Sequence, residues 1–258
     1  MYKNFRKECN EYIKKQSENS DFNSCTNRWV NLSYQFKYMY NYEVLGRPII
    51  QYPQDMVAMQ ELIWSIKPDL IVETGIAHGG SLILNASMLA LLDMVDAIES
   101  DKTIYPKASR RKVLGIDIDI RAHNSAAIEA HPMACRIQMI QGSSTAPEII
   151  AQVKDVAKDY QRILVCLDSN HTHEHVLAEL EAYTPLVTRC SYCVVFDTII
   201  EDLPDNFFPD RPWSKGNNPK TAVWEFLRNN DRFEVDKEIE NKLLITSAPD
   251  GYLKCTKD

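Results

Sequence analysis

The sequence predicts an α/β fold in which a doubly wound, mostly parallel sheet follows an N-terminal helical extension. Short apolar runs rich in β-branched residues alternate with longer helical patterns along most of the chain. Several of these runs end in glycine or an acidic residue, which is typical of parallel strands whose carboxyl ends meet at one ligand-binding edge. At 258 residues the chain is long enough to bury one sizeable core.

The composition indicates an ordinary globular protein, with 45% hydrophobic and 25% charged residues. A net charge of -7 and the absence of a dominant basic face argue against nucleic acid or an anionic membrane as the main partner, which leaves a small molecule. We judge no apolar run long enough to span a bilayer, and the N-terminus is polar and charged, so we expect a cytoplasmic protein.

The seven cysteines have no framework spacing, and we interpret Cys190-x-x-Cys193 as packed thiols rather than a redox or zinc site.

Residues 1–47 differ from the rest because they are rich in Tyr, Asn and Lys, with aromatic side chains crowded between Trp29 and Tyr42. We expect helices and irregular structure here. They would form a cover over the core, a subunit contact or an aromatic lid over a substrate. Gly46-Arg47-Pro48 interrupts the pattern, so the main domain is predicted to span residues 48–258.

A glycine turn after the first strand of this domain is the clearest chemical signal. Leu70 to Val72 reads as a buried strand, and a helix is predicted from about Gly79 to Leu92. Gly75 and Gly79 let backbone approach a ligand, and Glu73 adds a carboxylate. The spacing E-x-G-x-x-x-G-G is not the G-x-G-x-x-G of dinucleotide sites, and an acid suits a cationic amino-acid moiety better than a pyrophosphate. The turn therefore favours S-adenosylmethionine over NAD, and a purely structural turn is the alternative.

The remaining elements continue the alternation. Strands are predicted at Val113–Asp117, Ile137–Ile140, Arg162–Leu167 and Tyr192–Phe196. Helices are predicted at Asp55–Ile66, Arg121–His131, from Thr145 or Ala146, at Thr172–Leu186 and at Thr221–Asn229. A polar insertion, 93–111, should loop outside the sheet, and the apolar, proline-containing segment 201–219 should be an ordered or closing loop over the site. Residues 232–235 and 243–246 are expected to form a terminal antiparallel pair, before a short extended piece at 251–253.

Three aspartates follow predicted strands. Asp117 closes the second strand, where an acid suits hydrogen bonding to ribose hydroxyls, unless it caps a helix or turn. Asp168 and Asp197 close later strands and should meet at the same edge. Two carboxylates there suit magnesium, which would make a bound hydroxyl a better nucleophile; capping of the following helices is the alternative.

Histidines crowd the segment after Asp168. The register fails for an H-x-H-x-D-H zinc hydrolase. His171, nearest the strand end, is the candidate general base towards a reacting hydroxyl, unless it is a helix-terminal histidine paired to an acid. An iron-dependent oxygenase would instead combine His171 or His175 with Asp168.

These residues also carry a family resemblance. The ordered motifs are Leu45-Gly46-Arg47-Pro48, Pro53-x-Asp55, Val72-Glu73-Thr74-Gly75 with Gly79-Gly80-Ser81, Gly115-Ile116-Asp117-Ile118-Asp119, Gly142-Ser143, Leu167-Asp168-Ser169-x-His171 with His175-Val176-Leu177, Val194-Val195-x-Asp197-Thr198 and Gly251-Tyr252-Leu253. From about Val44 onward the chain resembles the cephalosporin hydroxylase family. That resemblance implies a Rossmann-like class I methyltransferase fold. It also implies S-adenosylmethionine-dependent O-methylation, often with magnesium and often in an oligomer, as in cephamycin-pathway and sugar O-methyltransferases.

The resemblance implies that Glu73, Gly75, Asp117 and Ser143 line the cofactor site and that Asp168 and Asp197 bind the metal. Together with the candidates from the residues themselves, the cofactor-binding set is Glu73, Gly75, Ala77, Gly79, Ser81, Asp117, Gly142, Ser143 and Asp168; the catalytic candidates are His171 and Asp168; the metal candidates are Asp168, Asp197 and Thr198. One departure is Phe196, because related members tend to have Glu before the second metal aspartate. Thr198 or water would then complete the magnesium site.

The expected function is therefore that of an S-adenosylmethionine-dependent, magnesium-assisted O-methyltransferase. It would act on a hydroxyl of a sugar, polysaccharide or secondary metabolite, as a homo-oligomer. The acceptor pocket would be built from the aromatic N-terminal segment and the 201–219 loop. The alternatives are a metal-dependent oxygenase and a non-catalytic binding protein on the same fold.

Overall fold

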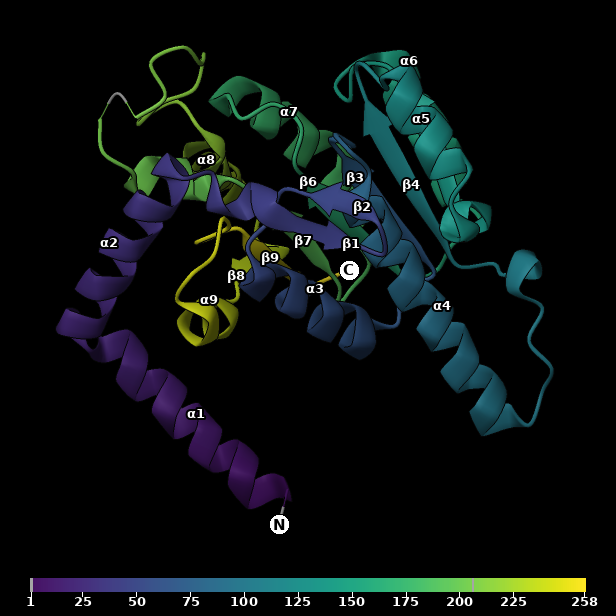
Figure 1. The fold of residues 1–258 in the computed structure, drawn as a ribbon, viewed down its shortest axis with the longest axis horizontal. Coiled ribbons are helices and arrows are strands. Elements are labelled where there is room, and N and C mark those ends of the chain that lie inside the picture. The colour runs from purple at the N-terminus through teal and green to yellow at the C-terminus, as the bar shows by residue number, and fades with distance from the viewer. Residues whose placement is uncertain (1, 206) are drawn as a thin grey trace.

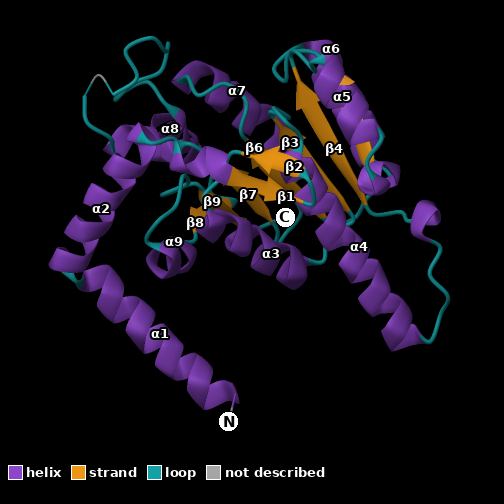
Figure 2. Cartoon of the chain, viewed as in Figure 1, coloured by secondary structure: helices purple, strands orange, loops and turns teal. Residues whose placement is uncertain are grey.

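A seven-stranded sheet forms the centre of the computed structural model, which describes residues 2–205 and 207–258. Its strands, in spatial order, are β5 (Ile137–Gln141), β4 (Lys112–Asp117), β3 (Leu70–Thr74), β6 (Ile163–Leu167), β7 (Tyr192–Val195), β9 (Tyr252–Cys255) and β8 (Phe233–Val235). The first five are parallel, and β9 pairs antiparallel with both β7 and β8 (Figure 2). The predicted doubly wound, mostly parallel sheet is confirmed.

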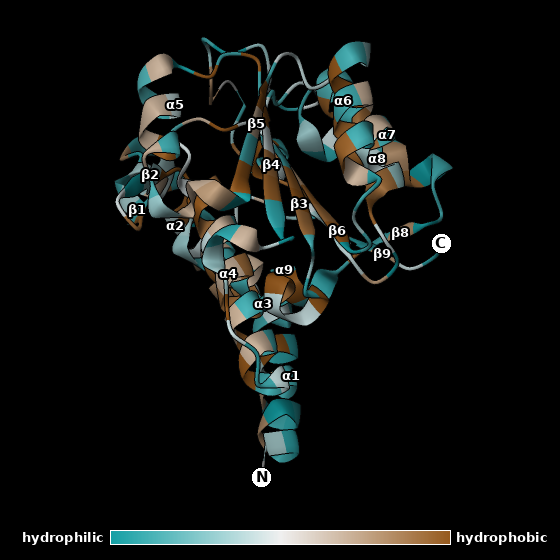
Figure 3. Cartoon of the chain, turned by 90° about the vertical axis from the view of Figure 1, so that its right-hand side faces the viewer, coloured by the Kyte–Doolittle hydropathy of each residue, from teal (hydrophilic) through white to brown (hydrophobic). Residues whose placement is uncertain are grey.

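Helices cover both faces of this sheet, as the turned view shows (Figure 3). The helices are α1 (Tyr2–Glu18), α2 (Ser20–Gln35), α3 (Pro53–Ile66), α4 (Gly80–Ser100), α5 (Ala122–Glu129), α6 (Pro147–Ala157), α7 (His173–Tyr183), α8 (Pro219–Asn229) and α9 (Lys237–Leu243). One core packs β3, β4 and β6 side chains against α6, α7 and α8, and the other packs the alternate side chains against α3, α4 and α5. All five β3 residues are buried because the strand lies between two helical layers.

The N-terminal region is helical, and α1 extends away from the sheet (Figure 1). After α2, a short turn leads into a two-stranded hairpin of β1 (Tyr42–Val44) and β2 (Arg47–Ile49), which lies against α4. The β2 backbone approaches the start of α4 so closely that a side chain at Gly80 would overlap the carbonyl of Pro48. Strand β2 of this hairpin spans the predicted boundary after residue 47. The division into an N-terminal extension and a main domain stays a prediction.

One sequence prediction about helix α4 is wrong. The helix continues through residues 93–100, which were expected to begin an insertion outside the sheet, because apolar helical spacing persists to Ile98. Arg111 holds this end of the helix by ion pairs with Asp93 and Asp96. By length and composition alone α4 is also long and apolar enough to cross a membrane, a test that buried core helices pass as well. Its composition has a structural explanation, because one face of the helix, including Leu82 and Leu89, is buried in the core.

The expected terminal strand pair is also wrong. Residues 243–246 are not a strand, because Asp236 caps the short helix α9 by accepting a hydrogen bond from the Glu238 N–H at 3.1 Å, and that helix runs to Leu243. The β8 strand pairs instead with β9, in a register that puts Phe233 opposite Cys255. The C-terminal strand thus lies inside the sheet rather than beyond it.

A buried carboxylate connects α3 to the segment before β9. Asp55 is fully buried and accepts hydrogen bonds from Thr246, Ser247 and Tyr252, with side-chain oxygen distances of 2.5, 3.0 and 2.8 Å. The Ser247 backbone N–H donates to it as well, at 2.8 Å. Because a buried carboxylate is stable only when its oxygens are paired, this network holds Ser247 in the wall of the cavity described next.

Candidate functional site

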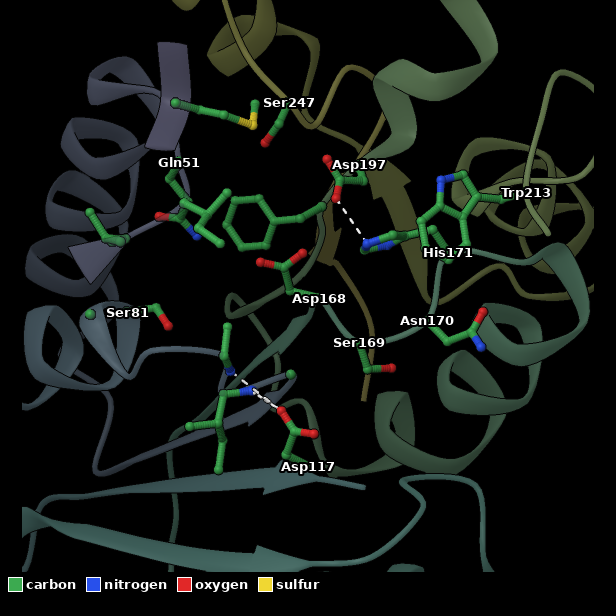
Figure 4. A pocket seen from close by; sticks show the side chains of 18 of the residues that line it. Gln51, Ser81, Asp117, Asp168, Ser169, Asn170, His171, Asp197, Trp213 and Ser247 are labelled. Carbon is green, nitrogen blue, oxygen red and sulfur yellow. Dashed lines mark hydrogen bonds and ion pairs between the residues drawn. The ribbon is translucent and has the colours of Figure 1, made fainter. Parts of the chain in front are cut away.

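One large cavity, of about 760 Å³, opens at the carboxyl ends of β3, β4, β6 and β7. Its volume is typical of small-molecule sites. Figure 4 shows Asp168 in the middle, with Asp117 on one side and the Asp197–His171 pair on the other. Parallel strands direct their carboxyl ends to the same edge, so residues more than a hundred positions apart in sequence share one wall.

The glycine turn after β3 shapes one half of the cavity. Gly75 has φ +89°, and a Cβ there would overlap the carbonyl oxygen of Asp168. The turn then presents the N–H groups of Ile76 and Ala77 to Oδ2 of Asp117, at 2.8 and 3.3 Å. Asp117 also accepts a hydrogen bond from the Asp119 N–H at 3.1 Å. The carboxylate is therefore held in place by three backbone donors at the cavity wall.

Most of the predicted site residues come together here. The cavity wall includes Gly75, Ala77, Ser81, Asp117, Ser143, Asp168, His171 and Asp197. Gly79 and Gly142 lie outside it, and a Cβ at either position would overlap an isoleucine side chain, Ile128 or Ile149. Those two glycines allow close packing against the two isoleucines, and their predicted contact with the cofactor stays a prediction.

Glu73 also lies behind the wall rather than in it. Its side chain is 2% exposed, and its carboxylate accepts hydrogen bonds from the Ser81 hydroxyl and, at 2.8 Å, from the Asn85 amide. Burial raises its pKa from an ordinary 4.5 to about 7, while the two hydrogen bonds act in the opposite direction. Ser81 lines the cavity and Glu73 does not, and the predicted direct contact of Glu73 with a cationic ligand stays a prediction.

Asp168, His171 and Asp197 form the chemical centre of the cavity. One ligand atom from each lies within 4.8 Å of the other two. His171 Nε2 is 3.1 Å from Oδ2 of Asp197. Burial, and then the neighbouring Asp197, raise the pKa of Asp168 well above its ordinary value. Two adjacent carboxylates with an imidazole form an oxygen-rich donor set that a divalent cation would stabilise.

The predicted third metal ligand does not belong to this set. Thr198 is fully buried and its hydroxyl donates to the Pro249 carbonyl at 2.6 Å, so its side chain does not reach the cavity. Phe196 does line the cavity, at the position where a carboxylate was expected from the family pattern. In this chain His171, rather than a further carboxylate, is the titratable side chain that lies beside the two aspartates.

The other two histidines of the crowded segment have different partners. His175 Nε2 lies 3.0 Å from the Ser144 hydroxyl and 3.1 Å from the Ser169 hydroxyl, beside the buried Glu179. His173 contacts Thr221 and Glu225 of α8, at 2.8 and 3.1 Å. Only His171 of the three is placed beside both aspartates.

The cavity wall also contains residues from the two segments that the sequence predicted for an acceptor pocket. Tyr34 from α2 and Trp213 from the 201–219 loop both line it, and so does Gln51 before α3. The Trp213 ring meets the His171 ring edge-on, with 4.7 Å between centroids. The sequence indicated the two segments, but it did not indicate which of their residues line the cavity, and it gave no signal for Gln51.

A family model described as Rhamnosyl O-methyltransferase/CmcI matches residues 36–256 of the chain. Among curated proteins, the chain is 30% identical over 206 residues to the rhamnosyl O-methyltransferases of Mycobacterium tuberculosis and Mycobacterium bovis, covering 77% of this chain and 72% of theirs. The Mycobacterium leprae rhamnosyl O-methyltransferase is 28% identical over 211 residues, covering 81% of both chains.

Solved structures share the fold at lower identity. An apo structure of CmcI has a TM-score of 0.56 at 16% identity, covering 85% of this chain and 78% of that one. CmcI with magnesium and S-adenosylmethionine gives 0.52 at 17% identity, covering 84% and 78%. The apo structure of CalS11, a TDP-rhamnose 3'-O-methyltransferase, gives 0.52 at 16% identity, covering 98% and 94%.

The raised pKa of Glu73 predicts how the free energy of unfolding depends on pH. The folded state holds this proton more tightly than the unfolded state does, so the free energy of unfolding should fall as pH rises from about 4.5 to about 7. Glu73→Gln cannot lose a proton and should lack this contribution, which is on the order of 3 kcal/mol. Urea denaturation at a series of pH values measures it as the difference between wild type and variant.

The matched control is Glu148→Gln, at an exposed position on α6. Its difference from wild type should stay flat across the same pH range. A flat difference for Glu73→Gln as well would show that the Glu73 carboxyl titrates normally.

Proposed function

The chain belongs to the Rhamnosyl O-methyltransferase/CmcI family and is an S-adenosylmethionine-dependent methyltransferase, and we propose that it methylates a sugar hydroxyl with the help of magnesium. The observation that carries the proposal is one cavity in which the glycine turn, Asp117 and the Asp168–His171–Asp197 cluster meet. Methyl transfer is an in-line displacement, so holding hydroxyl, methyl and sulfur in line supplies much of the rate.

The glycine turn and Asp117 would hold the cofactor. Gly75 lets the turn pack against the Asp168 backbone at the cavity wall, and Asp117 offers a carboxylate whose position is set by the Ile76 and Ala77 N–H groups. A carboxylate at the end of this strand suits the two ribose hydroxyls of the cofactor. Ser143, at the end of β5, lines the same half of the cavity.

The aspartate pair would hold magnesium. Asp168 and Asp197 supply hard oxygen ligands at the strand ends, and waters or acceptor oxygens would fill the remaining positions. A bound magnesium ion supplies Lewis acidity, which eases loss of the proton from an acceptor hydroxyl. The relatives' names support a sugar as that acceptor, since the mycobacterial proteins are rhamnosyl O-methyltransferases.

His171 would receive the proton from the acceptor hydroxyl. Its Nε2 lies 3.1 Å from Asp197, which orients the ring, and Trp213 packs against the ring from the loop side. A base oriented by a carboxylate is a frequent arrangement in proton transfer. The oxygenase alternative needs a second histidine beside Asp168, and His175 is engaged with Ser144 and Ser169 instead. We also propose, from the sequence, a cytoplasmic homo-oligomer.

Binding of S-adenosylhomocysteine tests the cofactor assignment by isothermal titration calorimetry. Asp117→Ala removes the carboxylate assigned to the ribose hydroxyls, so its Kd should rise at least tenfold, about the loss of one or two hydrogen bonds to a charged group. Asp119→Ala is the control, because this neighbour lies outside the cavity wall. Equal affinity for both variants and wild type would remove Asp117 from the site.

Magnesium binding tests the metal assignment by thermal unfolding. Saturating Mg²⁺ should raise Tm of the wild type by several degrees, since a ligand at about 100 Kd stabilises by about 2.7 kcal/mol. Asp168→Asn should lose this shift. Without metal, however, the variant should melt no lower than wild type, because the change removes a buried carboxyl beside Asp197. A full magnesium shift in Asp168→Asn would contradict the assignment.

Turnover with methyl α-L-rhamnopyranoside as acceptor tests the base. His171→Gln should lower kcat by about 10²- to 10⁴-fold while the Kd for S-adenosylhomocysteine stays unchanged. His173→Gln is the matched control, because His173 faces α8 rather than the aspartate pair. Comparable kcat losses in both variants would mean that His171 has no special role.

A further inference from the structure

The acceptor half of the cavity has an aromatic wall built from two distant segments. Tyr34 from α2 meets Phe207 and Phe208 from the loop edge-on, with centroid distances of 5.8 and 6.0 Å. Trp213, from the same loop, packs against His171. Tyr34, Phe208 and Trp213 all line the cavity, so the wall lies on the side of the proposed base. This brings together the two segments that the sequence predicted for the acceptor pocket.

The Tyr34 hydroxyl is an unexplained polar group in this wall. Its oxygen is buried and has no hydrogen-bond partner among residues 2–205 and 207–258. The adjacent Tyr52 differs, because its hydroxyl lies 2.7 Å from the Ser33 hydroxyl. The two rings are neighbours, 6.3 Å apart. A buried hydroxyl without a partner destabilises a fold, so its retention calls for a partner that arrives from outside.

The Tyr34 hydroxyl can act as a hydrogen-bond donor, because a phenol with the ordinary pKa of about 10 is protonated at neutral pH. Burial, followed by the nearby Asp197, raises the pKa of Tyr34 well above its ordinary value. Tyr52, Asp55 and Asp168 act in the same direction. The phenol therefore stays protonated and can donate to an oxygen of a molecule bound beside Asp197.

We propose that Tyr34 is an acceptor-binding residue whose hydroxyl donates a hydrogen bond to a sugar hydroxyl next to the one that is methylated. This rests on the proposed function. A sugar combines polar edges with an apolar face of C–H groups, and the wall offers the matching pair, one buried donor beside the Phe208 and Trp213 rings. Because the Tyr34 oxygen is buried, the proposal includes movement of a neighbouring side chain when the acceptor binds, and Phe208, which packs on Tyr34 and lines the same cavity, is the candidate.

Tyr34→Phe removes only the hydroxyl and is compared with Tyr52→Phe, which removes a hydroxyl that already has a partner. With methyl α-L-rhamnopyranoside and S-adenosylmethionine, Tyr34→Phe should raise the acceptor KM about tenfold and leave the Kd for S-adenosylhomocysteine unchanged. Its Tm without ligand should equal or exceed that of wild type. Tyr52→Phe should show the reverse, a lower Tm with an unchanged acceptor KM.

Deoxy analogues of the same glycoside, each lacking one hydroxyl, identify the group that Tyr34 contacts. For one analogue the tenfold difference in KM between wild type and Tyr34→Phe should vanish, because the shared hydrogen bond is already absent. A difference that persists for every analogue, an unchanged KM, or a fall in Tm as large as that of Tyr52→Phe would overturn the role of Tyr34. If wild type methylates no sugar, the proposed function fails instead, and the acceptor assumed here fails with it.

Discussion

The contact between Gly75 and the backbone of Asp168 is the constraint on which the site depends. The two residues follow paired positions of β3 and β6, where Thr74 lies opposite Leu167, and the Asp168 N–H donates to the Thr74 carbonyl at 2.9 Å. Any side chain at position 75 would overlap the Asp168 carbonyl. The absence of a Cβ therefore lets the turn after β3 bend towards β4, where its N–H groups meet Asp117.

The buried and half-buried acids near this contact differ in whether the fold supplies partners for their charge. Glu73 is satisfied inside the protein by Ser81 and Asn85, and Asp117 by backbone N–H groups. Asp168 has burial and a neighbouring carboxylate, both of which oppose its charge. The first two acids thus have their partners within the fold, whereas the Asp168–Asp197 pair is the one that gains most from a cation.

The proposed acceptor side of the cavity is built from segments outside the sheet. The aromatic wall joins α2 to the 201–219 loop, and the loop is held near α7 by hydrogen bonds such as that from the His173 N–H to Asn217, at 3.0 Å. Cofactor and metal chemistry therefore rest on rigid strand ends. The proposed substrate contacts come from elements that can vary without disturbing the sheet.

Local pattern was enough to place the alternating strands and helices, and with them Asp117, Asp168 and Asp197, because parallel strands bring their carboxyl ends to one edge whatever their order. Local pattern did not reveal that the Glu73 side chain hydrogen-bonds to Asn85 or that the Thr198 hydroxyl donates to the Pro249 carbonyl. It also did not reveal that β8 pairs with β9. Side-chain direction at a strand end and long-range strand pairing depend on register and packing. The glycine turn already favoured S-adenosylmethionine, and the resemblance to a family added O-methylation as the reaction. Only the tertiary structure brought Tyr34 and Trp213 to the same cavity as His171, because no periodicity within one segment records which distant segment it will meet.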